Sequence, residues 1–286
     1  ATIDLASPPA GVPLAEIYGP VSRGAGSTCS VALGFEIGMS LNPFGAGDVN
    51  GDGLHDLVVG SPDLDPTGDR PGGGVVDVHF GGGIPEIVDL AIDRGAWTIG
   101  AAGAGDGLGW QVSTGNVDGD GYADVVIGAP AATGRAGQLA AGYVAVVFGA
   151  SVPGTRVVDL LGADPSVAVR IHGPETGTGL GFTVATAYTG LDSYADILAG
   201  GSITRLVGGD VVAYPGEVHL IRGSFDRRSR DLALRPAEML VLGADALDPL
   251  RPPGERNIVD FAGWSLSDGD VNGDGFDDVV VGAMTW

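Results

Sequence analysis

Lysine is absent from this sequence, cysteine occurs once, and no apolar run reaches the roughly 18 residues that a membrane-spanning helix needs. With Cys29 alone, no disulfide can form within the chain. Positive charge is also scarce, because 14 arginines face 36 acidic residues and the formal net charge is −22. Such a charge repels phosphates, so it excludes nucleic-acid binding and favours cation binding. The first residues, Ala1–Asp4, lack the features of a signal peptide, and we expect the chain as given to be mature or trimmed.

The sequence also lacks an apolar stripe with the 3.6-residue period of a helix. Short apolar, β-branched runs alternate instead with turns rich in glycine, proline and aspartate, a pattern typical of an all-β protein. Glycine is abundant, at 52 of 286 residues, but it shows no third-residue period and so does not indicate collagen. Many tight turns account for it instead.

Four segments of the chain resemble one another. They read DVNGDGLHDLVVGSP from Asp48, NVDGDGYADVVIGAP from Asn116, YTGLDSYADILAGGS from Tyr188 and DVNGDGFDDVVVGAM from Asp270. Their starting points are 68, 72 and 82 residues apart. Repeats of this length, built from short strands, indicate a β-propeller of four-stranded antiparallel blades.

Each repeat supplies four predicted strands, A to D. Strand A follows a glycine–aromatic pair, which is Gly109-Trp110, Gly181-Phe182 or Gly263-Trp264. In the first repeat an insertion precedes the acidic segment, and Gly34-Phe35 and Gly38-Met39 are alternative equivalents of the pair. Strand B follows the acidic segment, and strand C begins at Val75, Tyr143 or Glu217. Strand D is predicted to begin at Ile87, Val157 or Arg230.

The whole chain, residues 1–286, is predicted to be a single propeller region. The repeats fall at roughly 20–99, 100–172, 173–243 and 244–286, and residues 1–19 add a stray fourth strand in which Ile3–Ala6 match strand D. The last repeat then lacks strand C, which favours part of a larger propeller over a small closed ring. Self-association through unpaired blade ends is the remaining alternative.

The acidic segments place oxygen atoms at alternate positions, which suits one wrapped cation. The predicted ligands are Asp48, Asn50, Asp52, the Leu54 carbonyl and Asp56; Asn116, Asp118, Asp120, the Tyr122 carbonyl and Asp124; and Asp270, Asn272, Asp274, the Phe276 carbonyl and Asp278. Oxygen donors of this number favour Ca²⁺, and we expect about three ions with a structural role. In the repeat at Tyr188 only Asp192 and Asp196 remain as carboxylates, so we expect that site to be empty or weak.

Two alternatives exist for the acidic segments. An EF-hand begins with the same spacing but needs a glutamate at position twelve, where this chain has Val59, Ile127 and Val281. Plain surface turns also use aspartate, asparagine and glycine. Three segments in register, each with three carboxylates that repel one another without a cation, favour the calcium interpretation.

The glycine–aromatic pair, the acidic segment and the VVIGAP-type strand together resemble the FG-GAP repeats of the integrin α-subunit propeller and its bacterial relatives. The resemblance covers essentially the whole chain, and three of the four repeats match closely. It implies a propeller, usually of seven blades, with Ca²⁺ loops between strands A and B. It also implies an extracellular location and a role in adhesion or ligand recognition.

The predicted propeller has two faces. The calcium loops occupy one, while the long B–C and D–A connections occupy the other, where loops on a rigid scaffold usually bind partners. Six arginines fall in these long connections and are candidate contacts for an anionic ligand: Arg23, Arg70, Arg135, Arg205, Arg251 and Arg256. Pairing with nearby acids is the alternative role. A second arginine cluster, at 222–235, is interpreted as a solvated edge on the calcium face.

The sequence therefore predicts a secreted or surface-exposed calcium-binding module for recognition or adhesion, with a protein or glycan partner. Catalysis is not expected, because no catalytic motif is present. Of the four histidines, His79 and His219 fall in predicted C strands, His172 follows a predicted D strand, and His55 stands at a non-ligand loop position. A lectin-like module, a self-assembling surface protein and a non-catalytic part of a secreted enzyme are the alternatives.

Overall fold

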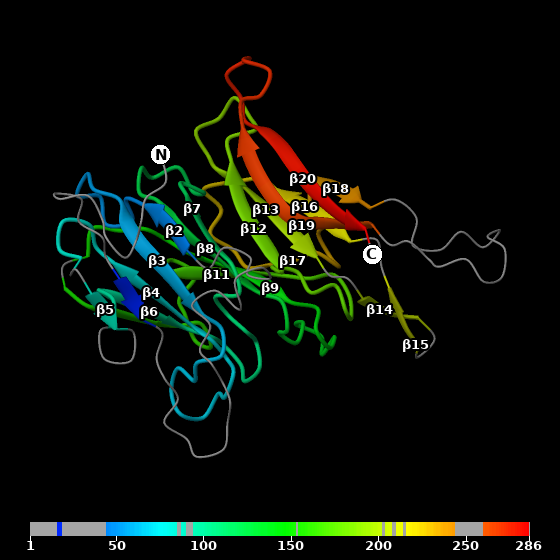
Figure 1. Cartoon of the computed structure of the whole chain (residues 1–286), viewed down its shortest axis with the longest axis horizontal. Helices are drawn as coiled ribbons and strands as arrows, with labels where there is room; N and C mark the ends of the chain where they lie inside the picture. The colour runs from blue at the N-terminus through cyan, green and yellow to red at the C-terminus, as the bar shows by residue number, and fades with distance from the viewer. Residues whose placement is uncertain are drawn as a thin grey trace.

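The computed structural model describes residues 16–18, 44–84, 87–89, 94–152, 154–201, 204–207, 210–213, 216–243 and 260–285. All regular structure in these ranges is β-strand, as predicted (Figure 1). Among these residues, no helix is long and apolar enough to cross a membrane.

Three sheets repeat the same antiparallel meander. The first contains β2 (Phe44–Gly47), β3 (Asp56–Ser61), β4 (Val75–His79) and β6 (Trp97–Gly100). The second contains β7 (Val112–Gly115), β8 (Asp124–Ala129), β9 (Tyr143–Val147) and β11 (Ala168–His172). The third contains β12 (Thr183–Ala187), β13 (Asp196–Gly201), β16 (Glu217–Ile221) and β18 (Met239–Leu242). Their registers correspond, since the pairs Val58–Val78, Val126–Val146 and Leu198–Leu220 occupy equivalent places.

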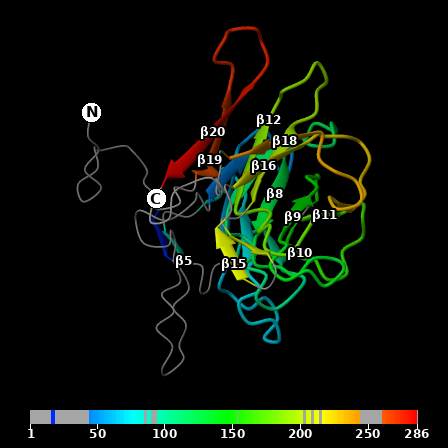
Figure 2. The ribbon, with the colours of Figure 1, turned by 90° about the vertical axis from the view of Figure 1, so that its right-hand side faces the viewer.

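Two hairpins lie outside these three sheets. The fourth repeat forms β19 (Asp260–Gly269) and β20 (Asp278–Thr285), which pair antiparallel and stand at the edge of the array in both views (Figures 1 and 2). A small hairpin of β14 (Thr204–Val207) and β15 (Asp210–Ala213) lies within the connection from β13 to β16.

The predicted strand D was wrong in each of the three repeats where it was placed. The segments concerned form β5 (Ile87–Asp89), β10 (Arg156–Asp159) and β17 (Arg230–Asp231), which lie outside the sheets of their own repeats and pair parallel with an earlier strand. Thus β10 lies along β6, β17 along β11, and β5 along β1 (Glu16–Tyr18). The alternating apolar pattern indicates a strand but not the sheet that receives it. Residues 1–6 and 34–41, where further strand and pair positions were predicted, lie outside the described residues.

The hydrophobic cores lie between neighbouring sheets. The first strands, β2, β7, β12 and β19, contact one another in chain order. One buried cluster joins valines of β3 and β4 to residues of β8 and β9, and another joins β9 and β11 to β13 and β16. Each fully buried valine or isoleucine contributes about 1.5–3 kcal/mol, so each sheet is stabilised mainly by the next one.

The glycines of the two repeated motifs meet across these sheet interfaces. A Cβ atom on Gly128 of β8 would lie 1.9 Å from the carbonyl oxygen of Gly181, and one on Gly60 would lie 2.1 Å from that of Gly109. Gly109 and Gly181 themselves have positive φ, +89° and +92°. The backbones therefore approach too closely for any side chain, which explains why both motifs carry glycine.

Candidate functional site

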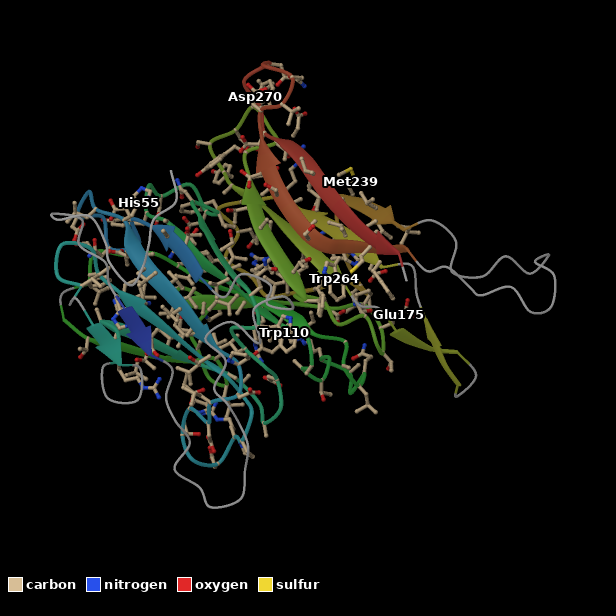
Figure 3. The ribbon with its side chains drawn as sticks, viewed as in Figure 1. His55, Trp110, Glu175, Met239, Trp264 and Asp270 are labelled. Atoms are coloured by element: carbon tan, nitrogen blue, oxygen red, sulfur yellow. The ribbon has the colours of Figure 1, made fainter. Side chains whose placement is uncertain are left out.

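The acidic loops form a row on one face of the molecule and are joined by hydrogen bonds. Figure 3 shows His55 of the first loop and Asp270 of the last on this face, opposite Trp110. The eighth residue of each following loop donates its N–H to the first carbonyl of the loop before it. The bonds run from Ala123 to Asp48 (2.9 Å), from Ala195 to Asn116 (2.8 Å) and from Asp277 to Tyr188 (3.0 Å).

In the first three loops the aspartate at position nine fastens the loop to its own sheet. Asp56, Asp124 and Asp196 are fully buried. One oxygen of each accepts the N–H of a glycine that follows strand C, at 2.9 Å from Gly81, 2.9 Å from Gly149 and 3.0 Å from Gly223. In the first two loops the other oxygen accepts the N–H of Val49 (2.8 Å) or Val117 (2.7 Å). The position-nine aspartate thus holds the loop in shape as well as offering oxygen to an ion.

The first and last loops share one internal geometry. Asp48 accepts the N–H groups of Gly51, Asp52 and Gly53 at 2.7, 3.0 and 2.9 Å, and Asp270 accepts those of Gly273, Asp274 and Gly275 at 2.6, 3.0 and 2.8 Å. The four glycines have positive φ between 75° and 91°, which lets the backbone curl around the first aspartate.

The second loop brings three carboxylates together. Oxygen atoms of Asp118, Asp120 and Asp124 lie within 4.8 Å of one another, the only cluster of three acids this close in the described part of the chain. Burial, followed by the charge of Asp118, raises the pKa of Asp124 from its usual 3.8 to about 7. The pKa of Asp118 is also raised, by burial and then by Asp120. Carboxylates forced together in this way favour a bound cation.

The donor set of the second loop fits Ca²⁺. The Oδ1 atom of Asn116 is buried and accepts no hydrogen bond from the described residues. Asn116 is the first residue of the loop. The loop that holds the three carboxylates therefore also contains a buried amide oxygen that accepts no hydrogen bond within the described ranges. All these ligands are oxygen, as Ca²⁺ prefers, and no nitrogen or sulfur ligand that would favour zinc is among them.

An arginine from the third repeat reaches into the second loop. Arg227 contacts Asp118, and its Nη2 lies 3.0 Å from Asp120. The guanidinium also lies 4.3 Å from the ring centre of Phe148 and donates to the Ser166 carbonyl at 3.0 Å. A positive charge therefore stands where the acids would otherwise repel one another.

The degenerate loop, Tyr188–Asp196, has a similar arrangement with Arg222. Its Nη1 lies 3.5 Å from Asp196, and a Cβ on Gly190 would lie 2.4 Å from the same nitrogen, so glycine at loop position three leaves room for the guanidinium. In the other two sheets the residue at the place of Arg222 is Phe80 or Phe148. The arginines of residues 222–235 are thus not simply a solvated edge, because two of them contact the loops.

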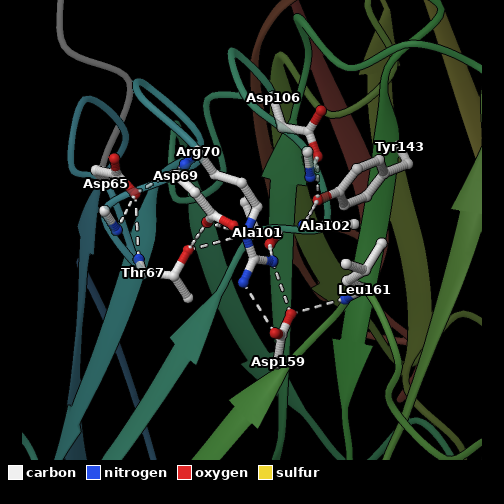
Figure 4. Close-up of polar contacts among 12 residues, drawn as sticks. Asp65, Thr67, Asp69, Arg70, Ala101, Ala102, Asp106, Tyr143, Asp159 and Leu161 are labelled. Atoms are coloured by element: carbon white, nitrogen blue, oxygen red, sulfur yellow. Dashed lines mark hydrogen bonds and ion pairs between the residues drawn. The ribbon is translucent and has the colours of Figure 1, made fainter.

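Of the six arginines predicted as ligand contacts, Arg70 has a different role. It is buried and forms a two-pronged ion pair with Asp159 of β10 at 2.7 and 2.8 Å, and it also donates to the Ala101 carbonyl (Figure 4). The hydrogen bonds from Arg70 lower the pKa of Asp159. Arg70 therefore fastens the outer strand to the first sheet.

Of the other five arginines predicted as ligand contacts, Arg135 is exposed. Arg23, Arg251 and Arg256 lie outside the described residues, as does the side chain of Arg205.

The opposite face carries a groove with aromatic walls. Its volume is about 480 Å³, and its lining includes Trp110, Phe182, Pro62 and Pro130. Trp110, Phe182 and Trp264 form a ladder, with ring centres 5.9 and 5.4 Å apart. All three are half-buried, so each packs partly in the fold and remains partly accessible.

The motif positions agree with a known repeat. The model of the FG-GAP repeat matches residues 44–79, 108–147 and 262–286. The chain carries FG-GAP repeats. Each of the first two matched segments contains a strand A, an acidic loop, a strand B and a strand C, so the repeat unit includes the candidate calcium loop.

Longer proteins are similar to part of this chain. Phosphatidylinositol-glycan-specific phospholipase D from Homo sapiens is 27% identical over 176 residues, and the protein of that name from Bos taurus is 27% identical over 177. Each match covers 62% of this chain and 18% of the relative, so the chain spans less than a fifth of these proteins.

Solved structures of lyases show a distant likeness. Rhamnogalacturonan lyase YesW matches 86% of this chain and 40% of its own, with 18% identity and a TM-score of 0.44. The Bacillus licheniformis rhamnogalacturonan lyase PL11 matches the same shares with 17% identity and a TM-score of 0.40.

Proposed function

We propose that this chain is an extracellular, calcium-stabilised β-propeller module that recognises a protein or glycan. The observation that carries the proposal is the second loop, where three carboxylates lie within 4.8 Å beside the buried amide oxygen of Asn116. The extracellular location rests on the FG-GAP repeats, which are typical of extracellular proteins.

The propeller interpretation rests on how the sheets pack. Sheets of equivalent register follow one another in chain order, their first strands contact one another, and their cores lie between neighbours. The outer strands β10 and β17 add a second link, since each repeat pairs with the sheet of the repeat before it. Blades of a propeller are joined in the same order around a common axis.

Calcium in this module has a structural role. The residues that would hold it are Asp118, Asp120, Asp124 and Asn116 in the second loop, with the corresponding oxygens of the first and last loops as further sites. A bound ion would supply positive charge that offsets the repulsion among these carboxylates. Because the loops are hydrogen-bonded to one another, order in one loop supports the next, and the opposite face keeps its shape.

Titration of chelator-treated protein with Ca²⁺ tests the metal sites. We expect about three bound ions, with the second loop contributing one that disappears in the double variant Asp118→Asn, Asp120→Asn. Asp192→Asn in the degenerate loop is the matched control and leaves the count unchanged. Absence of calorimetric binding at millimolar Ca²⁺ would refute the proposal.

The recognition surface is assigned to the aromatic groove on the opposite face. Exposed edges of tryptophan and phenylalanine rings stack on sugars or pack against protein side chains. A glycan array and a cell-surface binding assay identify the partner, and Trp110→Ala should weaken its binding at least tenfold. Val157→Ala, at an exposed strand position that does not line the groove, is the control. Unchanged binding by the Trp110→Ala variant would show that the partner binds outside this groove.

A second candidate function is suggested by the phospholipase D relatives. Their matched region is 18% of a long enzyme, so the chain suits the role of an accessory part that orients an enzyme on its substrate. Phospholipase assays on the isolated chain, alone and added to a catalytic domain, separate this role from self-sufficient catalysis.

A further inference from the structure

A cavity of about 340 Å³ lies between the second and third sheets, beneath the connection from β16 to β18. Its floor is apolar and includes the buried side chains of Val146, Phe148, Val169 and Ile171. Volumes of this size are typical of pockets for small molecules.

The preceding pair of sheets shows what is missing from this cavity. Trp97 pairs with Val78 in the first sheet, and Val169 pairs with Val146 at the same register position in the second. Trp97 is fully buried between the first and second sheets, with its ring centre 5.9 Å from that of Phe80. At the equivalent position Val169 is much smaller, so the space that an indole ring fills in one interface is left open in the next.

The cationic neighbour of that ring is retained. Arg156 lies 4.6 Å over the Trp97 ring, two residues before the Val158–Ile99 pair. Arg228 lines the cavity and stands two residues before the equivalent Arg230–Ile171 pair. Its side chain is 85% exposed and pairs with Asp226 at 3.1 Å. An arginine therefore stands at the strand position from which Arg156 covers an aromatic ring.

The mouth of the cavity is positively charged in an otherwise acidic chain. Five arginines and three acids line it, a net charge of +2, whereas the whole chain carries −22. Arg222 and Arg230 pair with Asp196 and Glu238. Arg235 forms no ion pair with any residue in the described ranges, and it stands at the rim with Arg228.

We propose that this cavity binds a small aromatic carboxylate. The ring occupies the place that corresponds to the indole of Trp97 and packs on Val146, Phe148 and Val169. The carboxylate meets Arg228 and Arg235 at the mouth. This site is separate from the groove on the opposite face and goes beyond the proposed recognition function.

Binding of indole-3-acetate tests the proposal, measured by calorimetry and ligand-observed NMR in saturating Ca²⁺, so that the loops are in the same state throughout. We expect a dissociation constant of roughly 0.1 mM, in line with the efficiency of small ligands. The neutral analogue indole-3-ethanol and the aliphatic acid octanoate should each bind at least fivefold more weakly.

Val169→Trp fills the cavity with the ring found in the first interface. This variant should lose detectable binding and melt at a higher temperature. Val157→Trp, the same change at a strand position that is 80% exposed, is the matched control and should bind as the wild type does. If Val169→Trp fails to fold, the exposed pair Arg228→Gln, Arg235→Gln provides the test. It should weaken indole-3-acetate at least fivefold and indole-3-ethanol by less, because only the acid also loses its charge partners.

The proposal is overturned by any of three results. One is a wild-type protein that binds none of these compounds at 5 mM, a concentration about fifty times the expected dissociation constant. Another is folded Val169→Trp protein that binds indole-3-acetate with wild-type affinity. The third is equal binding of indole-3-acetate, indole-3-ethanol and octanoate, which would show that the cavity recognises neither the aromatic ring nor the carboxylate.

Discussion

The second loop, Asn116–Asp124, and the degenerate loop, Tyr188–Asp196, are neighbours with the same frame but different contents. In both, a fully buried aspartate at position nine accepts the N–H of a glycine that follows strand C. The two loops are hydrogen-bonded to each other through Ala195 and Asn116. One holds three clustered carboxylates and an asparagine at position one, whereas the other has tyrosine and glycine at positions one and three.

This comparison separates the frame of the loop from its ion ligands. The frame survives where the candidate ligands are lost, so the position-nine aspartate has a structural role that does not depend on the proposed metal site. In the degenerate loop Arg222 lies beside Asp196 and supplies the positive charge internally. Four predictions test whether the frame and the ion ligands are separate, in order of decreasing expected effect.

Removal of the position-nine aspartate should damage both loops alike. Asp124→Ala leaves the buried N–H groups of Val117 and Gly149 without acceptors, and Asp196→Ala does the same to that of Gly223. We expect each to lower the free energy of unfolding by about 3–5 kcal/mol in urea denaturation. The exposed Asp192→Ala is the control. A loss under about 1 kcal/mol would mean that the frame does not depend on this residue.

Restoration of the ligands should restore a calcium site in the degenerate loop. The graft replaces residues 188–193 by Asp-Val-Asn-Gly-Asp-Gly and adds Arg222→Phe, the residue found in the other sheets. One further ion should bind, and at a hundredfold excess over its dissociation constant it adds about 2.7 kcal/mol of stability. The same graft with Arg222 retained is the matched control and should bind calcium more weakly. No gain in bound calcium would show that the frame alone is insufficient.

Calcium binding to the second loop should depend on pH. Because the pKa of Asp124 is raised from 3.8 to about 7, its ionised form is disfavoured in the ion-free fold. That fold therefore loses stability as pH rises from about 4 to 7. Calcium requires the ionised carboxylate, so its affinity should be about tenfold lower at pH 6 than at pH 8, near 1.4 kcal/mol. Calorimetry in buffers of different ionisation enthalpy measures the released proton, and a pH-independent affinity would contradict this.

Arg227→Gln should have the smallest effect of the four. It should lower the stability of the ion-free protein and raise the calcium affinity of the second loop. The ion-free protein loses the contacts to Asp118 and Asp120 and should be destabilised by no more than about 1 kcal/mol. Calcium should bind the second loop a few times more tightly, since a competing positive charge is gone. Arg222→Gln, beside the degenerate loop, should leave this affinity unchanged, and equal effects of the two variants would indicate general electrostatics only.

The sequence predicts strands A, B and C and the loops between A and B, because each of these elements has a local sequence pattern. The acidic loop, the glycine–aromatic pair and the β-branched run are all contiguous. The pairing of Val157–Asp159 could not be predicted, because its alternating pattern is that of any strand and its partner, β6, lies some sixty residues earlier. The true fourth strands, such as Trp97–Gly100, were taken for connections.

The candidate site was predicted only in its acidic half. Arg227 meets Asp120 across 107 residues of sequence, and no local pattern reports such a contact. Arg222 did leave a signal. It replaces the phenylalanine of the other repeats in the one repeat whose loop lost its acids, and an alignment of the repeats with one another shows both changes together.

The most direct test of the account is a thermal melt of the chelator-treated protein, repeated in millimolar Ca²⁺ and in millimolar Mg²⁺. Structural calcium predicts a rise of roughly 5–10 °C per well-occupied loop with Ca²⁺ and little change with Mg²⁺. Identical melting temperatures in all three conditions would show that the acidic loops are ordinary turns, and the assignment of this chain as a calcium-stabilised module would be wrong.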